Sequence, residues 1–343
     1  MKLAVIGPNF FSYVQAVVAR LQQRGIEARF FDERHANSVA AKIYYRAGLH
    51  KALPGARERH LAGIIETIID EGFTHVLMIN AEAVGPAHAA RLRARGLKLF
   101  FYSWDSLRNK PDFIHLRSEL TALATFDPVD AQRLNLRYIP LFADDVFSAR
   151  LHGSGAPRDI ALSFCGTLHS NRSTLLRRVL RHFPAVADQV DLKIFSHSRL
   201  VFLLKALRRI DDFAFRRIVS TTAFSRQEIA DTLFRSCYVL DIPHPAQNGL
   251  TARTFEALRA GARLVTFNRH VRRLPASLQS RVVLLDEAPQ AGGLDPRPAP
   301  LPPLSDAEDY FLSIDRFVDD LQEMMGLPSP GCPDHRSDTA VNG

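Results

Sequence analysis

Apolar runs and amphipathic segments alternate along the chain. Short apolar runs predict buried strands at residues 2–6, 28–31, 75–79, 98–102 and 122–125. Between them, apolar side chains three to four residues apart predict amphipathic helices at residues 11–24, 61–71 and 86–95. This alternation predicts a parallel, doubly wound sheet covered by helices on both faces.

The same alternation restarts after a short segment with Gly and Pro, residues 148–158. Further strands are predicted at residues 160–165, 192–195, 238–242, 263–267 and 282–286, with helices at residues 171–182 and 226–236 and from Asn248 onward. Five prolines between residues 290 and 305 exclude a regular element there, and an amphipathic pattern predicts one long final helix at residues 306–325.

These boundaries predict the domain organisation of an α/β protein with two doubly wound, Rossmann-like domains. We expect the first domain at residues 1–150 and the second at 151–290. A Pro-rich linker and a C-terminal closing helix follow at 291–327, and a disordered tail at 328–343.

Composition narrows the partners of the protein. The 343 residues are 46% apolar and 23% charged, as in an ordinary globular protein, and the net charge of +8 favours anionic partners. The basic residues are spread along helices without interleaved aromatics, so nucleic acid is not expected. No run reaches the roughly 18 apolar residues of a membrane span, no signal peptide is evident, and the three cysteines have no metal or disulfide spacing. We therefore expect a cytoplasmic location.

The segment from Tyr238 to Asn268 carries the strongest chemical pattern. Asn248, Gly249, Leu250 and Thr251 are expected to open a helix whose first backbone N–H groups suit an anion. Arg253 and Glu256 are three apart and share one face of that helix. An arginine suits a phosphate and a carboxylate suits sugar hydroxyls, so the segment predicts a nucleotide-sugar site.

Other donor-side candidates follow strand ends of the second half. Gly166 and Thr167 form a strand-to-helix turn next to Arg172, which suits a phosphate but equally suits an ordinary turn. His244, between two prolines, and His197, at another strand end, either contact the donor or are incidental loop histidines.

The first half offers candidates for the acceptor side. Asp105 follows a strand end and either acts as a general base or caps a turn, and the neighbouring Trp104 suits stacking on a sugar. The turn that contains Asn9 lacks the glycines of a dinucleotide fingerprint, so no cofactor is expected. No pair of carboxylates stands where a divalent ion would be needed, so no metal is expected either.

Several stretches together resemble a known family. The residues that fit its pattern are Gln247, Gly249, Leu250, Thr251, Arg253, Glu256, Gly261 and Asn268. With residues 101–107, 125–142 and 163–172, they make the chain similar to bacterial capsular and lipopolysaccharide biosynthesis proteins related to spore-maturation-type glycosyltransferases of the GT-B fold.

The resemblance implies transfer of a sugar from a nucleotide-sugar donor to a glycan or lipid-linked acceptor in surface-polysaccharide assembly. It also implies that Gln247 to Thr251, Arg253 and Glu256 bind the donor and that the loop with Asn9 faces the acceptor. Asn248 departs from the pattern, because many retaining GT-B enzymes have a glutamate there, eight positions before the second one. A nucleotide-sugar 2-epimerase and a non-catalytic binding module on the same fold are the alternatives.

The segment at residues 199–219 combines six cations with many large apolar residues. It predicts one basic amphipathic helix, which either contacts the inner face of the membrane, grips an anionic acceptor, or packs within its domain.

Overall fold

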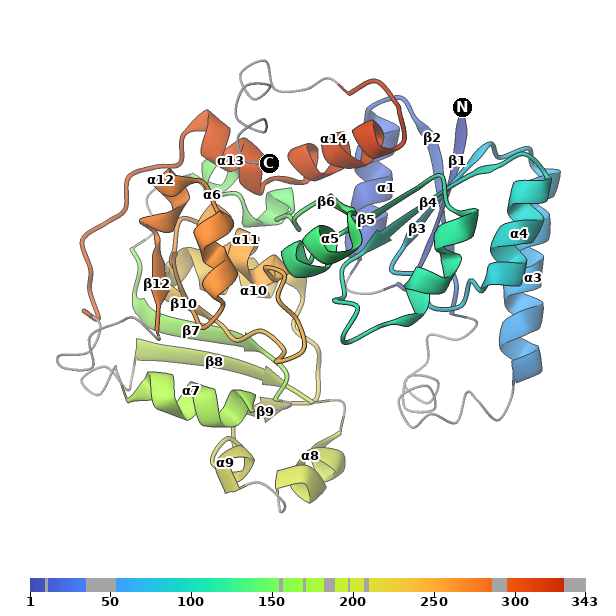
Figure 1. Cartoon of the computed structure of the whole chain (residues 1–343). Coiled ribbons are helices and arrows are strands. Elements are labelled where there is room, and N and C mark those ends of the chain that lie inside the picture. Colours follow the sequence, from blue (N-terminus) through green and yellow to red (C-terminus); the bar gives the residue numbers. More distant parts are fainter. Residues whose placement is uncertain are drawn as a thin grey trace. The chain divides into compact units, whose positions relative to one another are not determined.

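The computed structural model describes residues 1–9, 12–34, 54–153, 157–168, 171–181, 189–196, 198–206, 210–285 and 295–329. These residues form two compact units, each built around its own six-stranded sheet (Figure 1). Among the described residues, unit 1 comprises Met1–Pro140 and 317–329, and unit 2 comprises Leu141–Arg316. The division falls ten residues before the boundary that the sequence predicts.

The sheet of unit 1 is parallel and has the strand order β2-β1-β3-β4-β5-β6. Its strands are β1 (Lys2–Gly7), β2 (Glu27–Asp32), β3 (His75–Ile79), β4 (Lys98–Ser103), β5 (Ala122–Thr125) and β6 (Arg137–Tyr138). Its described helices include α1 (Tyr13–Gln23), α3 (Pro54–Asp70), α4 (Pro86–Ala94), the 3-10 helix η2 (Asp112–Glu119) and α5 (Pro128–Leu134).

Side chains of unit 1 alternate between the two faces of the sheet. Ala4 and Ile6 of β1 belong to a core cluster with α3, α4 and η2. Leu3 and Val5 are equally buried but lie outside this cluster. Both faces of the strand are therefore covered, which explains its continuous apolar run.

The sheet of unit 2 is also parallel and has the order β12-β11-β10-β7-β8-β9. Its strands are β7 (Ile160–Gly166), β8 (Val190–Phe195), β9 (Val219–Ser220), β10 (Ser236–Asp241), β11 (Arg263–Thr266) and β12 (Val282–Leu284). Its helices include α6 (Ala149–His152), α7 (Arg172–Leu180), α8 (Arg199–Ala206), α9 (Ile210–Phe213), α10 (Arg226–Arg235), α11 (Ala252–Arg259), α12 (Ala276–Gln279) and α13 (Asp306–Leu312).

Successive residues of the central strands in unit 2 enter different cores. Val239 and Leu264 pack with α10, α11 and α13. Leu240 and Val265, one position further along, pack with residues of α7 and α8 and with Phe215. The predicted doubly wound architecture is therefore confirmed in both units.

Two predicted helices are wrong in detail. Residues 199–219 do not form one helix, because the structure has the short helices α8 and α9 and then strand β9. The final helix is broken at Ser313, between α13 and α14 (Ile314–Met324). The Ser313 hydroxyl accepts the N–H groups of Asp315 and Arg316, and so it caps a new helix start. The second part of α14 belongs to unit 1, where Phe317 packs edge-on against Tyr102.

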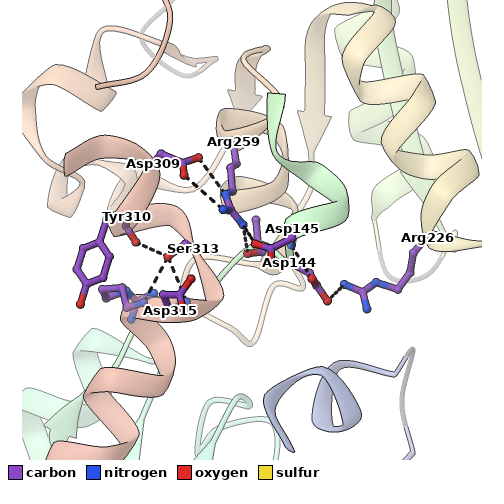
Figure 2. A network of polar contacts seen from close by, with 10 residues as sticks. Asp144, Asp145, Arg226, Arg259, Asp309, Tyr310, Ser313 and Asp315 are labelled. Atoms are coloured by element: carbon purple, nitrogen blue, oxygen red, sulfur yellow. Dashed lines mark hydrogen bonds and ion pairs between the residues drawn. The ribbon is translucent and has the colours of Figure 1, made fainter. Parts of the chain in front are cut away.

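A buried ion-pair network ties α11 to the surrounding elements of unit 2 (Figure 2). The Arg259 side chain is only 4% exposed. It donates to the Ala143 carbonyl at 3.0 Å, to Asp145 at 3.1 Å and to Asp309 of α13 at 3.1 Å. Next to it, Asp144 accepts from Arg226 of α10. The network therefore fixes the position of α11, which carries the principal candidate residues.

Replacing Arg259 by Ala should destabilise the protein by about 1–3 kcal/mol, because it leaves the Ala143 carbonyl and the largely buried Asp309 without their donor, while Asp145 stays in contact with water. The matched control is Arg235→Ala, which removes an exposed pair with Asp159 and should leave the free energy of unfolding nearly unchanged. Denaturant unfolding followed by circular dichroism measures both. Equal effects in the two variants would contradict the structural role of Arg259.

Candidate functional site

A buried carboxylate organises the carboxyl end of the sheet in unit 2. Asp241 ends β10, and its Oδ2 accepts from the hydroxyls of Thr251 at 2.8 Å and Thr254 at 3.1 Å. Burial raises the pKa of Asp241, while the Thr251 hydrogen bond and the nearby positive charge of Arg172 act in the opposite direction. The sequence analysis missed this residue, although an acidic residue that ends an otherwise apolar strand is a usable signal.

Arg172 joins the ends of two neighbouring strands. It begins α7, donates from Nε to the Ile242 carbonyl at 2.8 Å and from Nη1 to the Thr167 carbonyl at 3.2 Å. Burial lowers the pKa of its guanidinium, and the charge of Asp241 raises it. A Cβ on Gly166 would lie 3.6 Å from Nη1 of Arg172 and 3.2 Å from the Phe164 ring. The Phe164 ring is the tighter neighbour, so a larger residue at this turn would require that ring to shift by a few tenths of an ångström.

The loop between β10 and α11 is fixed by its own polar groups. The Nδ1 atom of His244 accepts the Ala246 N–H at 3.1 Å, which closes a tight turn. Asn268, after β11, donates from its side-chain amide to the Asn248 carbonyl at 3.2 Å and to the Gly249 carbonyl at 3.0 Å. Of the remaining predicted residues, Gln247 is half-buried and Leu250 lies in the core cluster around α11.

Helix α11 begins at Ala252, later than predicted, and Thr251 is its N-cap. The Thr251 hydroxyl donates to Asp241 and makes no capping hydrogen bond to the helix. Asn248, Gly249 and Leu250 therefore form the approach to the helix and do not open it. The first-turn backbone of α11 keeps the positive end of the helix dipole, which suits an anion.

Arg253 and Glu256 pair with each other on α11. The Arg253 Nη1 and the Glu256 Oε2 are 2.8 Å apart. The Glu256 side chain is 1% exposed and that of Arg253 is 16% exposed. The structure thus brings together the two residues that the sequence predicts for ribose and diphosphate, and it shows that each neutralises the other.

Two other predictions concern His197 and metal binding. His197 lies outside the described residues. Across the described ranges, no group of three or more His, Cys, Asp or Glu side chains is arranged to hold a metal ion.

In unit 1, Asp105 is held at the carboxyl ends of β3 and β4. Its Oδ2 accepts from the Asn80 side-chain amide at 3.1 Å and its Oδ1 from that of Asn109 at 2.9 Å. Asn80 has a left-handed backbone conformation, with φ of 49°. The sequence analysis missed Asn80, although Asn is one of the few residues that adopt this conformation readily. The adjacent Trp104 is half-buried.

The turn after β1 has a structural requirement for glycine. A Cβ on Gly7 would lie 2.5 Å from the Ile79 carbonyl oxygen, because β1 and β3 run close together there. Asn9 is exposed, and its backbone N–H donates to Asp32 at 3.4 Å.

Glu33 is a second buried carboxylate that the sequence analysis missed. Its side chain follows β2 and accepts the backbone N–H groups of Glu82 at 2.8 Å and Ala83 at 2.6 Å. Burial raises the pKa of Glu33 from 4.5 to about 7, although these two amides oppose the shift. The carboxyl group therefore holds the loop after β3 at the edge where unit 1 carries its candidate residues.

Comparison with known proteins identifies the fold of the chain. No protein-family model and no curated protein sequence matches the chain. Among solved structures, it is similar to a UDP-forming α,α-trehalose-phosphate synthase from Burkholderia xenovorans, with a TM-score of 0.57, 12% identity, and coverage of 95% of this chain and 100% of that one.

Two further structures are similar at comparable coverage. The S. aureus MnaA–UDP co-structure has a TM-score of 0.53 and 9% identity, over 97% of this chain and 99% of that chain. A Listeria monocytogenes protein proposed to be a UDP-N-acetylglucosamine 2-epimerase has a TM-score of 0.50 and 9% identity, over 95% and 88%. The chain therefore has the GT-B fold, with two Rossmann-like units.

The titration of Glu33 predicts a pH-dependent stability. Its folded pKa lies above its unfolded pKa, so the native state binds the extra proton between about pH 4.5 and 7. Glu33 should therefore stabilise the protein fully below pH 4.5, and this contribution should fall by about 3 kcal/mol as the pH rises to about 7. The measurement is the free energy of unfolding of the wild type minus that of Glu33→Gln across this range.

Glu71→Gln is the control for this experiment. Hydrogen bonds from Arg29 hold the pKa of Glu71 below its ordinary value, so its contribution should instead be lost as the pH falls. A Glu33 difference that is constant or rises with pH would overturn the prediction.

Proposed function

We propose that the protein is a glycosyltransferase that moves a sugar from a nucleotide-sugar donor to a glycan or lipid-linked acceptor in cell-surface polysaccharide assembly. It would act in the cytoplasm, at the inner face of the membrane. The observation that carries this proposal is the Arg253–Glu256 pair on the first turns of α11. The pair lies beyond the carboxyl end of β10, and open α/β sheets bind nucleotides beyond these strand ends.

In the proposed donor complex, Arg253 and Glu256 give up their contact with each other and bind the ligand instead. The diphosphate accepts from Arg253 and from first-turn amides of α11, and the ribose hydroxyls donate to Glu256. Gly166, Thr167 and Arg172 contribute a second phosphate contact, and His244 and Gln247 border the donor. The S. aureus neighbour was solved with UDP, and the Burkholderia neighbour is UDP-forming, which supports a nucleotide diphosphate as the ligand.

Unit 1 provides the acceptor side in this proposal. Asp105 acts as general base on the acceptor hydroxyl, since both of its oxygens are positioned by asparagine amides. Trp104 stacks on an acceptor sugar, and Asn9 contributes a polar contact.

The affinities of single variants for paired nucleotides test the donor site. Arg253→Ala should weaken nucleoside diphosphate binding by about 1.5–3 kcal/mol and should reduce the preference for a diphosphate over a monophosphate. Glu256→Ala should erase the preference for ribose over 2′-deoxyribose and should keep the preference for a diphosphate, because Arg253 remains. Calorimetry with the diphosphates and monophosphates of uridine, guanosine, adenosine and cytidine measures these differences.

The matched control for these variants is Arg24→Ala, which breaks a mostly buried pair with Asp319 in unit 1. It should lower the thermal midpoint and leave nucleotide affinity unchanged. Wild-type affinity in both the Arg253 and the Glu256 variants would remove the donor site from α11.

Turnover tests Asp105. Asp105→Asn should keep nucleotide affinity and lower the release of nucleotide from the donor sugar by about 10²–10⁴, the usual contribution of a general base. Asp127→Asn is the control, because Asp127 follows the next strand but caps α5 through the N–H groups of Val129 and Asp130. It should lower the thermal midpoint without slowing the folded enzyme.

The products distinguish the alternatives on this fold. If Asp105→Asn is less stable but fully active, Asp105 is a structural cap. A donor that is epimerised at C-2, with no nucleotide released, would replace transfer by the epimerase function proposed for the Listeria neighbour. Nucleotide binding with neither product would indicate a non-catalytic module.

A further inference from the structure

Exposed apolar side chains gather on one part of unit 2. Leu200 and Leu203 of α8 are 67% and 40% exposed, and Phe213 and Ile218, at and after the end of α9, are 39% and 45% exposed. Elsewhere in the described part of the chain, the exposed large apolar side chains are Met1, Val129 and Leu151. The four residues therefore form a concentration that chance exposure does not explain.

These side chains are left over after the core of the unit is filled. Helices α8 and α9 pack against each other, and α9 packs against α7 (Figure 1). Phe202 and Phe215 point inward and are 6% and 5% exposed, in the core cluster that includes β8 and β9. The inward side of the two helices is therefore already occupied by aromatic residues, so Leu200, Leu203, Phe213 and Ile218 belong to a second apolar face.

Cations accompany this second face. Arg199 and Arg217 are exposed, and the Arg216 guanidinium lies 4.2 Å from the centroid of the Phe213 ring. Asp212 is only 7% exposed. Leu200, Leu203, Phe213 and Ile218, together with Arg199 and Arg217, are named the α8–α9 face.

We infer that the α8–α9 face docks on an anionic phospholipid surface. Apolar side chains at the tips of short helices insert at the boundary between headgroups and acyl chains, and the flanking arginines pair with anionic headgroups. None of the described helices is long and apolar enough to cross a membrane. Contact through this face would therefore be peripheral. The inference adds a membrane-binding surface to the proposed function and rests on that function for its biological role. Its experimental test does not depend on the proposed function.

Sedimentation with lipid vesicles tests this inference on the full chain. Wild-type protein should bind phosphatidylcholine vesicles that contain phosphatidylglycerol, and bind pure phosphatidylcholine vesicles much more weakly. Added salt should weaken the binding to anionic vesicles, because it screens the arginines.

Two variants of the α8–α9 face separate its apolar and charged parts. Leu200→Ser with Phe213→Ser should lower the partition coefficient by about tenfold or more. Arg199→Gln with Arg217→Gln should lower it by about fivefold for each arginine, and only on anionic vesicles. All four residues are exposed, so thermal midpoints should stay close to that of the wild type.

The matched controls carry the same chemical changes elsewhere on unit 2. Leu151→Ser removes a side chain that is 69% exposed, and Arg272→Gln with Arg273→Gln removes two exposed arginines. Both should bind vesicles like the wild type. Loss of binding in the controls to the same extent would overturn the assignment to this face, as would equal binding to both kinds of vesicle or none to either.

Two further results would replace the lipid by another partner. A doubled mass in light scattering that Leu200→Ser abolishes would identify the α8–α9 face as a contact between two copies. Binding to duplex DNA that depends on Arg199 and Arg217, without vesicle binding, would identify a nucleic-acid surface. Nucleotide calorimetry on the same variants keeps the two proposals apart, because failed vesicle binding with intact nucleotide binding affects only the membrane inference.

Discussion

The architecture of the candidate donor site depends on how the chain satisfies one buried carboxylate, Asp241. A carboxylate in a protein core is costly unless it is hydrogen-bonded or paired. Asp241 accepts two hydroxyl hydrogen bonds from the start of α11 and lies near the charges of Arg172 and Arg253. These interactions fix where the helix begins relative to β10. They also explain why the Thr251 hydroxyl does not cap the helix.

Arg172 extends this constraint to the neighbouring strand. Because its guanidinium donates to carbonyls after β7 and after β10, it joins the two turns that border the site. The charges also balance. Two arginines, Arg172 and Arg253, face two acidic residues, Asp241 and Glu256. Without a ligand the site is therefore self-neutralised, and a diphosphate must compete with Glu256 for Arg253. That competition favours a ligand whose sugar hydroxyls compensate Glu256 at the same time.

The sequence was sufficient for the features that depend on local pattern. Continuous apolar runs revealed most of the strands, and the spacing of Arg253 and Glu256 placed them on one face, where they meet. It was insufficient for β6 and β9, because strands of two residues leave no pattern. It also failed for the segment at 199–219, where apolar residues point both inward and outward, so no single helical phase is evident.

The buried carboxylate of Glu33 could not be predicted for a different reason. Its burial is a property of tertiary neighbours that local sequence does not contain, whereas Asp241 is marked by its place at the end of an apolar strand. The break at Ser313 is similar. Serine tolerates a helix interior, and only the capping of Asp315 and Arg316 shows that a new helix begins there.

The fold alone does not decide between transfer and epimerisation, because one fold supports several chemistries. The similar structures share only 9–12% identity with this chain.

The argument for catalysis must therefore come from the chain itself, and Asn80 provides part of it. Asn is one of the few residues other than glycine that adopt a left-handed backbone readily, and Asn80 has this conformation. Asn80 is buried and donates its side-chain amide to Asp105. Asp105 also accepts from Asn109, so both of its oxygens are held in place by neutral donors, which orient a carboxylate without neutralising its charge. A carboxylate that is oriented and still charged is what a general base requires, and this is the physical basis for proposing Asp105 in that role.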